Sequence, residues 1–254
     1  MSPSKKNPFR RLYDKILDFI LPRKCILCGK INPKGEFENI CPKCARSIKL
    51  LNGARCLICA EPVGDANQPD IVGCPNCMRF PPNFNRCFAV AAFDGAVREM
   101  IIELKYRTGT YIMRDMSILV KKSRGIREFL QDAILVPVPL HRSRIIRRKY
   151  NQSDLIARML AKTFPECNIK VKPMLKRIRK TKTQTTLDRD ERAENMRGAF
   201  AIADKSAISK IPKDGKIIVV DDVITTSVTL SECAKIIKGA GYKNVNAFAI
   251  ARRI

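Results

Sequence analysis

Eight of the eleven cysteines fall into four Cys-x-x-Cys pairs, and this spacing constrains the fold more than any other feature of the sequence. A Cys-x-x-Cys turn places two thiolates on one side of a tight knuckle, at the separation that a tetrahedral zinc ion requires. Two such knuckles complete a structural site that leaves no coordination position open for catalysis. The sequence therefore predicts two structural Zn²⁺ sites. Their ligands are Cys25, Cys28, Cys41, Cys44, Cys56, Cys59, Cys74 and Cys77.

Two other chemistries use paired cysteines. A disulfide framework needs an oxidising compartment, for which nothing in the sequence argues, and evenly spaced knuckles suit zinc better than an iron–sulfur cluster. If neighbouring pairs share an ion, they enclose loops of 12 and 14 residues, whereas an interleaved cross-brace would enclose longer loops. Because shorter loops cost slightly less closure entropy, we expect the sequential pairing, with the cross-brace as the alternative.

Beyond the cysteine pairs, apolar segments alternate with amphipathic ones. Apolar strands separated by amphipathic helices form a parallel sheet that helices cover on both faces, so the predicted fold class is α/β. The predicted strands span residues 87–93, 134–140, 216–220 and 245–252. The predicted helices span residues 97–106, 113–122, 151–164 and 229–241.

The pattern divides the chain into three predicted parts. Residues 1–22 contain a docking helix, apolar at helical spacing, for which a helix lying on a membrane surface is the alternative. A double zinc-ribbon module spans 23–80, and two prolines at 81–82 precede an α/β domain over 85–254. No apolar run reaches the roughly 18 residues needed to span a bilayer, and no signal peptide is visible, so we expect a cytoplasmic location.

The charge balance is strongly basic, since 49 Lys and Arg residues face 24 Asp and Glu residues, for a formal net charge of +25. Fourteen of the basic residues lie between His141 and Lys182, where only Asp154 and Glu166 oppose them. A charged run is often only a solvated face, but a field of this sign and density favours polyphosphate or nucleic-acid partners.

Two adjacent carboxylates follow the predicted strand 216–220, and a hydroxyl-rich stretch follows them. In parallel sheets ligands bind beyond the carboxyl ends of the strands, and N–H groups at the start of a helix favour anions. The carboxylates suit the paired hydroxyls of a ribose or an adjacent Mg²⁺, and the hydroxyls suit phosphate oxygens. The stretch therefore predicts a site for a phosphorylated sugar, with an exposed strand end and a Ser/Thr helix cap as the alternative. Its residues are Asp221, Asp222, Thr225, Thr226, Ser227 and Thr229.

Five ordered motifs resemble the ComF family of competence proteins, which join a double zinc ribbon to a type I phosphoribosyltransferase domain. They are the four cysteine pairs, ELKYRTG, VPVPLHRSRIIRRKYNQSDLIARMLA, KTQTTLDRDERAENMRGAF and VVDDVITTSVTL. The resemblance covers nearly the whole chain. It implies a type I phosphoribosyltransferase-like sheet, binding of phosphoribosyl pyrophosphate (PRPP) with Mg²⁺, and a role in DNA uptake and natural transformation.

The resemblance also implies roles for individual residues. The acidic pair would bind the ribose hydroxyls, and the loop after it the 5′-phosphate. Basic residues from a loop over 139–144 and from a mobile basic loop would bind the pyrophosphate. Together with Mg²⁺ they would stabilise its charge as it leaves the anomeric carbon. The residues with catalytic roles are Asp221, Asp222, Lys182 and Arg142. The PRPP-binding residues are Asp221, Asp222, Thr225, Thr226, Ser227, Thr229, Lys105, Tyr106, Arg142, Arg144, Gln184 and Arg192.

Two positions depart from the family pattern. Ser227 replaces the glycine of the usual Thr-Thr-Gly, and Lys149 replaces the glycine of the usual Arg-Gly-Phe-Asn-Gln. A serine held at positive φ would cost about 1 kcal/mol, so we expect PRPP binding to be weakened but to survive. Thr225 stands where purine-using relatives place an aspartate base, so transfer to a 6-oxopurine is not expected.

The implied partners are PRPP, single-stranded DNA and competence or DNA-processing proteins. Aromatic residues make up only 6% of the chain and Trp is absent, so charge would contribute more to DNA binding than stacking. Two other functions stay open: an active phosphoribosyltransferase with an unidentified acceptor and no DNA role, and a regulatory protein that senses PRPP. The aromatic residues that could stack on bases are Phe80, Phe84, Tyr106 and Tyr150.

Overall fold

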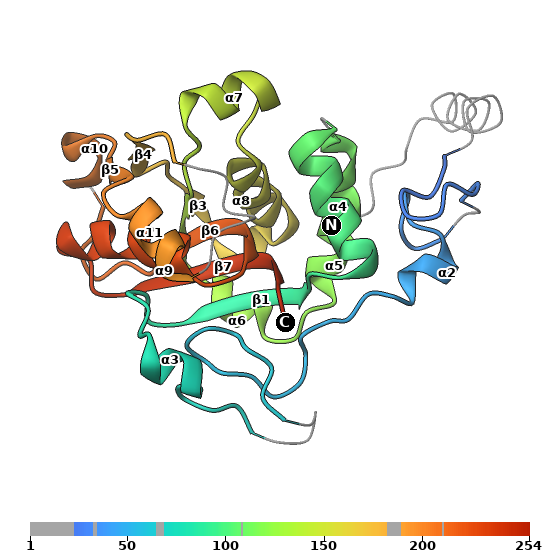
Figure 1. The fold of residues 1–254 in the computed structure, drawn as a ribbon, viewed down its shortest axis with the longest axis horizontal. Coiled ribbons are helices and arrows are strands. Elements are labelled where there is room, and N and C mark those ends of the chain that lie inside the picture. The colour runs from blue at the N-terminus through green and yellow to red at the C-terminus, as the bar shows by residue number, and fades with distance from the viewer. Residues whose placement is uncertain (1–22, 33–34, 65–68, 108, 182–188, 210) are drawn as a thin grey trace.

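The computed structural model describes residues 23–32, 35–64, 69–107, 109–181, 189–209 and 211–254. The docking helix predicted within residues 1–22 lies outside the described residues. The predicted fold class is confirmed, because a parallel sheet with helices on both faces follows the segment that holds the cysteine pairs (Figure 1). The predicted boundaries between the three parts stay predictions.

Five parallel strands form the central sheet. Their order is β1 (Cys87–Ala92), β7 (Val245–Arg252), β6 (Ile217–Ile224), β2 (Ile134–Pro137) and β3 (Lys170–Val171). β6 therefore lies in the middle, between β7 and β2. β1, β2 and β7 are buried along their whole length, which explains why their sequences are nearly continuous apolar runs.

One face of the sheet packs on three helices, α4 (Gly95–Tyr106), α5 (Met113–Lys121) and α8 (Gln152–Thr163). Successive strand residues point to opposite faces, so Ile218 and Val220 of β6 belong to this core. Asp94 begins α4, because its side chain accepts a hydrogen bond from the N–H of the next residue.

The other face packs on α11 (Val228–Gly239). α9 (Arg189–Met196) and the antiparallel strands β4 (Leu175–Arg177) and β5 (Phe200–Ile202) complete this second core. Two short helices, α6 (Ile126–Leu130) and α10 (Lys205–Ser209), were not predicted from the sequence. None of the helices in the described part of the chain has the length and apolar character needed to span a bilayer.

The strand predicted over 216–220 is longer than expected. β6 runs on to Ile224 because β7 continues to pair with it, with Asp221 opposite Ala249 and Ile224 opposite Arg252. The acidic pair therefore lies inside the strand near its carboxyl end, not beyond it. The strand predicted over 134–140 is shorter and ends at Pro137.

The loop predicted over 139–144 is also different, because Arg142 begins a short helix, α7 (Arg142–Arg148). His141 caps this helix, and its Nδ1 accepts a hydrogen bond of 3.3 Å from the N–H of Ser143. No residue of α7 is buried, so its sequence lacks the apolar period that reveals packed helices.

The cysteine-rich segment attaches to the edge strand β1. The N–H of Leu51 donates to the carbonyl of Val90, and the N–H of Ala92 donates to the carbonyl of Lys49, both at 2.9 Å. The segment contains two short helices, α2 (Pro42–Ala45) and α3 (Pro75–Arg79). In Figure 1, α2 lies on the side of α4 and α5, and α3 lies beyond β1, at the edge of the sheet.

Candidate functional site

The eight paired cysteines form two groups, and each group unites neighbouring pairs along the chain. Within each group the sulfur atoms all lie within 4.8 Å of one another. The sulfurs of Cys28 and Cys41 are 3.8 Å apart, and those of Cys59 and Cys74 are 3.6 Å apart. A tetrahedron with Zn–S bonds of about 2.3 Å has edges of about 3.8 Å, so both groups fit zinc. The predicted sequential pairing is confirmed. The first group is Cys25, Cys28, Cys41 and Cys44, and the second is Cys56, Cys59, Cys74 and Cys77.

The second pair of each group has the sequence Cys-Pro-x-Cys. Its proline opens a short helix, α2 or α3, and Cys41 or Cys74 is the N-cap residue. Proline is favoured at the first helical position because it needs no N–H partner there and its φ already fits a helix. The helical turn then presents both thiols on one side.

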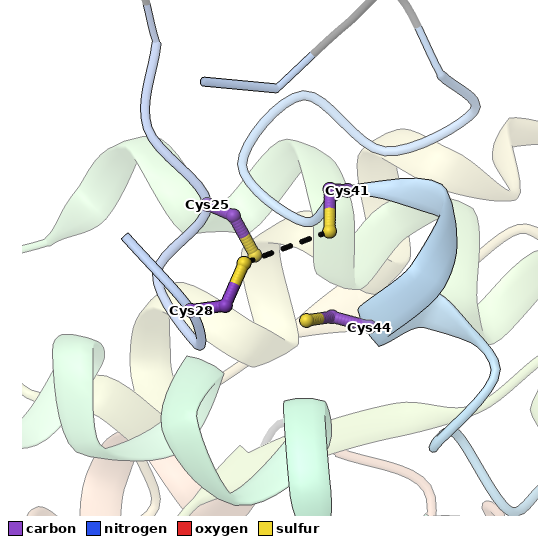
Figure 2. Close-up of side chains that lie close together, drawn as sticks. All are labelled: Cys25, Cys28, Cys41 and Cys44. Atoms are coloured by element: carbon purple, nitrogen blue, oxygen red, sulfur yellow. Dashed lines mark hydrogen bonds between the residues drawn. The ribbon is translucent and has the colours of Figure 1, made fainter. Parts of the chain in front are cut away.

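The first pair of each group lies on a tight turn that ends at positive φ. Gly29 closes the first turn with a φ of 70°, and Ala60 closes the second with a φ of 62°. In each turn the N–H of this residue donates to the carbonyl of the first cysteine. Figure 2 shows the outcome for the first group, in which the thiols of Cys28 and Cys41 approach each other from separate segments.

A buried carboxylate connects the first cysteine group to the α/β domain. Asp115 of α5 is fully buried and accepts hydrogen bonds from the backbone N–H groups of Glu38 at 2.7 Å and Asn39 at 2.9 Å. The side-chain amide of Asn39 donates a third, at 3.0 Å. These residues lie just before Cys41, so Asp115 fixes the loop that presents this ligand.

A buried arginine connects the second cysteine group to the sheet. Arg252, the last residue of β7, is 2% exposed and donates from Nη1 to the carbonyl oxygen of Cys59 at 2.7 Å. Its Nη2 pairs with the carboxylate of Glu61. Four thiolates around one Zn²⁺ have a net negative charge, which the adjacent guanidinium would offset.

The acidic pair lies beside one lysine at the carboxyl end of β6. Asp222 is 3% exposed, and its Oδ1 lies 2.7 Å from Nζ of Lys105 in α4. Burial lowers the pKa of Lys105, but the charge of Asp222, its hydrogen bond with Lys105 and the charge of Asp221 together outweigh burial, so the pKa is raised overall. Oδ2 of Asp222 is buried and has no hydrogen-bond partner among the described residues. A hydroxyl or a cation could complete the environment of this oxygen.

Asp221 points toward a different set of partners. Its Oδ1 accepts hydrogen bonds from Oγ of Ser153 in α8 at 3.1 Å and from the N–H of Asp222 at 2.9 Å. Although part of the side chain reaches solvent, loss of hydration raises the pKa of Asp221 to about 7, and the negative charge of Asp222 adds to this effect. Asp221 therefore exchanges a proton near neutral pH.

The loop between β6 and α11 contains the predicted phosphate-binding residues. Ser227, the N-cap of α11, has a φ of 65°, so the position that the family fills with glycine is left-handed here. Its side chain makes no capping hydrogen bond. The N–H groups and dipole of the α11 N-terminus favour an anion. The hydroxyl-bearing residues of this region are all partly exposed, namely Thr225, Thr226, Ser227 and Thr229.

The predicted pyrophosphate residues lie on α7. Arg142 is exposed, and Nη2 of Arg144 donates to the carbonyl oxygen of Thr181 at 3.3 Å. A residue that the sequence analysis missed meets them there, since Nη2 of Arg177 donates to Oγ1 of Thr181. Burial lowers the pKa of Arg177 to about 10, and the positive charge of Arg144 adds to this. Arg177 lies two residues after Leu175 in β4, so both side chains point to the same face of the strand. A basic residue on the face of the buried Leu175 was the sequence signal that could have identified it.

Of the remaining predicted site residues, some lie within the described structure and others lie outside it. Tyr106 lies beside Lys105 and lines a pocket of about 230 Å³. Lys182 and Gln184 lie outside the described residues, and Arg192 lies within α9. The structure thus brings together Lys105, Asp221 and Asp222, while the binding and catalytic roles of all these residues stay predictions.

Comparisons with known proteins place this architecture among relatives. A family model described as "Double zinc ribbon domain" matches residues 16–78. The chain is 27% identical over 233 residues to "Competence protein F" of Haemophilus influenzae, covering 90% of this chain and 96% of that protein. It is 28% identical over 242 residues to "DNA utilization protein YhgH" of Escherichia coli K12, covering 92% of this chain and 99% of that protein.

Two further similarities are more distant. "Competence protein ComFC" of Streptococcus pneumoniae is 24% identical over 247 residues, covering 90% of this chain and 100% of that protein. A purine phosphoribosyltransferase structure from Pyrococcus horikoshii aligns with 56% of this chain and 83% of its own, at 17% identity and a TM-score of 0.29. That structural similarity is too low to bear on function. These relatives, each matched over 90–92% of the chain, confirm the resemblance to ComF proteins.

Proposed function

We propose that this chain, a homologue of competence protein F, ComFC and YhgH with a double zinc ribbon, binds PRPP with Mg²⁺ and handles single-stranded DNA in DNA uptake. Homology alone shows neither PRPP binding nor DNA binding, so each is argued from residues of this chain. The names of the relatives concern competence and DNA utilization, which favours a role in natural transformation for this chain too. The PRPP half depends on the acidic end of β6.

One observation supports PRPP binding more than any other. A buried carboxylate, Asp222, has one oxygen paired with Lys105 and the other without a partner among the described residues, at the carboxyl end of the central strand. Leaving such an oxygen unsatisfied costs free energy unless a ligand supplies a donor or a cation. The hydroxyl-rich start of α11 follows within a few residues. A diol receptor followed by an anion site matches a sugar with a terminal phosphate.

The chain's own residues would then act as follows. Asp221 and Asp222 accept hydrogen bonds from the ribose hydroxyls, and the start of α11 holds the 5′-phosphate. Arg142 and Arg144 hold the pyrophosphate and stabilise the charge that develops on it as it leaves. When bound with PRPP, Mg²⁺ neutralises part of that charge, and the oxygen ligands of the acidic pair are of the type this ion prefers.

Calorimetric titration with PRPP and Mg²⁺ at up to millimolar ligand tests the proposal. We expect measurable heat for the unmodified protein and loss of binding for Asp222→Asn. Asp214→Asn is the matched control, since Asp214 is an exposed aspartate that precedes the same strand at its opposite end. Absence of heat in the unmodified protein, or equal binding by both variants, would refute PRPP binding at this site.

The DNA half of the proposal depends on the basic surface around α7. Within the described residues, none of the four arginines of α7 forms an ion pair, so their charge remains available to phosphates. Arg177 and Thr181 extend this surface through their contacts with Arg144. Anisotropy of a labelled single strand at about 50 mM salt should show binding that weakens steeply as salt rises. Binding independent of salt would contradict a phosphate-based contact.

A second candidate function, a PRPP sensor without transferase activity, is favoured by two backbone positions. Ser227 and Lys149 both have positive φ where the family has glycine, so the site keeps the conformation but not the residue that adopts it without strain. Mass analysis of products after incubation with PRPP, Mg²⁺ and candidate acceptors distinguishes an active transferase from a sensor. Pyrophosphate release that Asp222→Asn abolishes supports a transferase, and binding without turnover supports a sensor.

A further inference from the structure

The four aromatic residues that could stack on bases differ sharply in accessibility. Phe84 is 3% exposed and belongs to the second core. Tyr150 is half-buried, and its hydroxyl donates to the carbonyl of Leu104 at 2.6 Å. Phe80 is half-buried beneath the guanidinium of Arg79. Tyr106 is 61% exposed, so among these candidates it offers the most accessible ring.

Tyr106 belongs to a small pocket with a uniform electrostatic character. The pocket has a volume of about 230 Å³ and is lined by Lys105, Tyr106, Arg147 and Arg148, so three of its four lining residues are basic and none is acidic. The guanidinium carbon of Arg148 lies 5.3 Å from the centre of the Tyr106 ring. The Nε atom of Arg148 is buried and has no hydrogen-bond partner among the described residues. The pocket therefore combines an exposed ring, a planar cation and an unsatisfied donor.

The pocket adjoins the acidic pair through one shared residue. Lys105 lines the pocket, and its Nζ lies 2.7 Å from Oδ1 of Asp222. A group bound on Tyr106 would therefore lie next to the proposed ribose site. In a pentosyl transfer the acceptor must reach the anomeric carbon from a neighbouring position, so a pocket on this side of the acidic pair is where an acceptor could bind.

We propose that the Tyr106–Arg148 pocket is a nucleobase subsite that holds one base of a phosphate-bearing acceptor beside the sugar of PRPP. This inference rests on the proposed function and names the acceptor class that the function leaves open. A nucleobase stacks on an aromatic ring and on a guanidinium plane, and its phosphate is attracted by lysine and arginine. A bare anion would use the charges but not the exposed ring. The phosphate-bearing base could come from a free mononucleotide or from a DNA strand, because both have the same chemistry.

Fluorescence anisotropy with two strands of equal length and charge separates base contacts from phosphate contacts. One strand is a thymidine oligomer and the other is abasic throughout. We expect the unmodified protein to bind the thymidine strand about 10-fold more tightly, as stacking of a base typically gives. The preference should disappear in Tyr106→Ala and persist in Tyr106→Phe, which keeps the ring.

Tyr111→Ala is the matched control. Tyr111 is also exposed, at 51%, but lies outside the pocket and donates its hydroxyl to Glu103. It should leave the preference unchanged. Competition by thymidine monophosphate would identify a mononucleotide as a sufficient ligand, and retention of the preference without competition would identify a strand. Equal affinity for both strands, or a preference that Tyr106→Ala preserves, would overturn the proposal.

Calorimetry with PRPP on the unmodified protein distinguishes this proposal from the one on which it rests. A base preference without PRPP heat would leave the subsite standing and refute PRPP binding. PRPP heat without a base preference would refute the subsite alone.

Discussion

Lys105 supplies one positive charge beside two carboxylates at the end of β6, and this balance decides what the site can bind. Asp222 is paired with the lysine, whereas the hydrogen bonds that Asp221 accepts within the described part of the chain come from a hydroxyl and a backbone N–H. The pKa of Asp221 is raised to about 7 by its surroundings, with desolvation as the largest cause. A ligand that brings Mg²⁺ adds positive charge and so favours the ionised form of Asp221.

A pH dependence of PRPP binding follows from this residue. A carboxyl group with a pKa of about 7 is mostly protonated below that pH and mostly ionised above it. The affinity for PRPP with Mg²⁺ should therefore rise about tenfold from pH 6 to pH 8 beyond the change due to the ligand's own phosphates. Calorimetry on Asp221→Asn isolates the effect, because this variant retains only the ligand's contribution. Identical pH profiles for both proteins would contradict the assignment.

The backbone conformation of Lys149 leads to a prediction about stability. It ends α7 with a φ of 67°, a left-handed backbone that a residue with a Cβ adopts at a cost. Lys149→Gly should raise the free energy of unfolding by up to about 1 kcal/mol, measured by urea denaturation. Lys122→Gly is the control. Lys122 ends α5 with a φ of −84°, so glycine at this position should lower the free energy of unfolding instead. A loss of stability in Lys149→Gly would show that the lysine side chain outweighs the strain.

At the scale of elements, burial decides which parts of the fold can be predicted from sequence. The apolar periods of α4, α8 and α11 and the apolar run of β7 were sufficient to predict these elements. α7 was missed because it buries none of its residues, and β4 because it is only three residues long. The extension of β6 through the acidic pair depends on pairing with β7, which a local pattern cannot report.

The link between β7 and the second cysteine group gives a prediction about the metal. Arg252→Met removes the buried donor to Cys59 and the charge that offsets four thiolates. Zinc analysis should give two equivalents for the unmodified protein. In the variant, one equivalent should be lost to a chromogenic chelator about 10- to 100-fold more readily, and the other should be unaffected. The first cysteine group thus serves as an internal reference.

Arg253→Met is the matched control for this experiment, since Arg253 is the exposed neighbour, and its backbone N–H, which the substitution keeps, donates to the carbonyl of Ile224 in β6. It should release both zinc equivalents at the original rates. Arg252→Lys should restore part of the retention because it keeps the charge. Equal acceleration of both equivalents in Arg252→Met would indicate general unfolding instead of a local effect.

The formal net charge of the whole molecule is +25, but the basic residues do not all have the same effect on ligand binding. The arginines of α7 lie on a helix that packs no residue into either core, and α7 follows the carboxyl end of β2, on the side where sheets of this type generally bind ligands. Charges held in this way attract a phosphate backbone over a distance of about 10 Å at moderate salt. The family resemblance was readable from sequence because its motifs lie in order along the chain. The pocket around Tyr106 was not, because its residues come from α4 and α7.

Salt dependence measures how many of these charges touch DNA. The double variant Arg142→Gln with Arg147→Gln should lower the slope of log affinity against log salt by about 1 to 2 for a single strand. Arg158→Gln is the control, because Arg158 is also exposed but is paired with Asp154 at 2.7 Å. An unchanged slope in the double variant would place the DNA elsewhere on the molecule.

A crystal structure of the protein soaked with PRPP and Mg²⁺ would test the proposed sugar-phosphate site at the carboxyl end of β6. We predict the ribose hydroxyls on Asp221 and Asp222, with the 5′-phosphate at the start of α11 and Lys105 displaced from its present contact. Density for the ligand only on the arginines of α7, or an intact contact between Lys105 and Asp222 with no ligand beside it, would contradict the account.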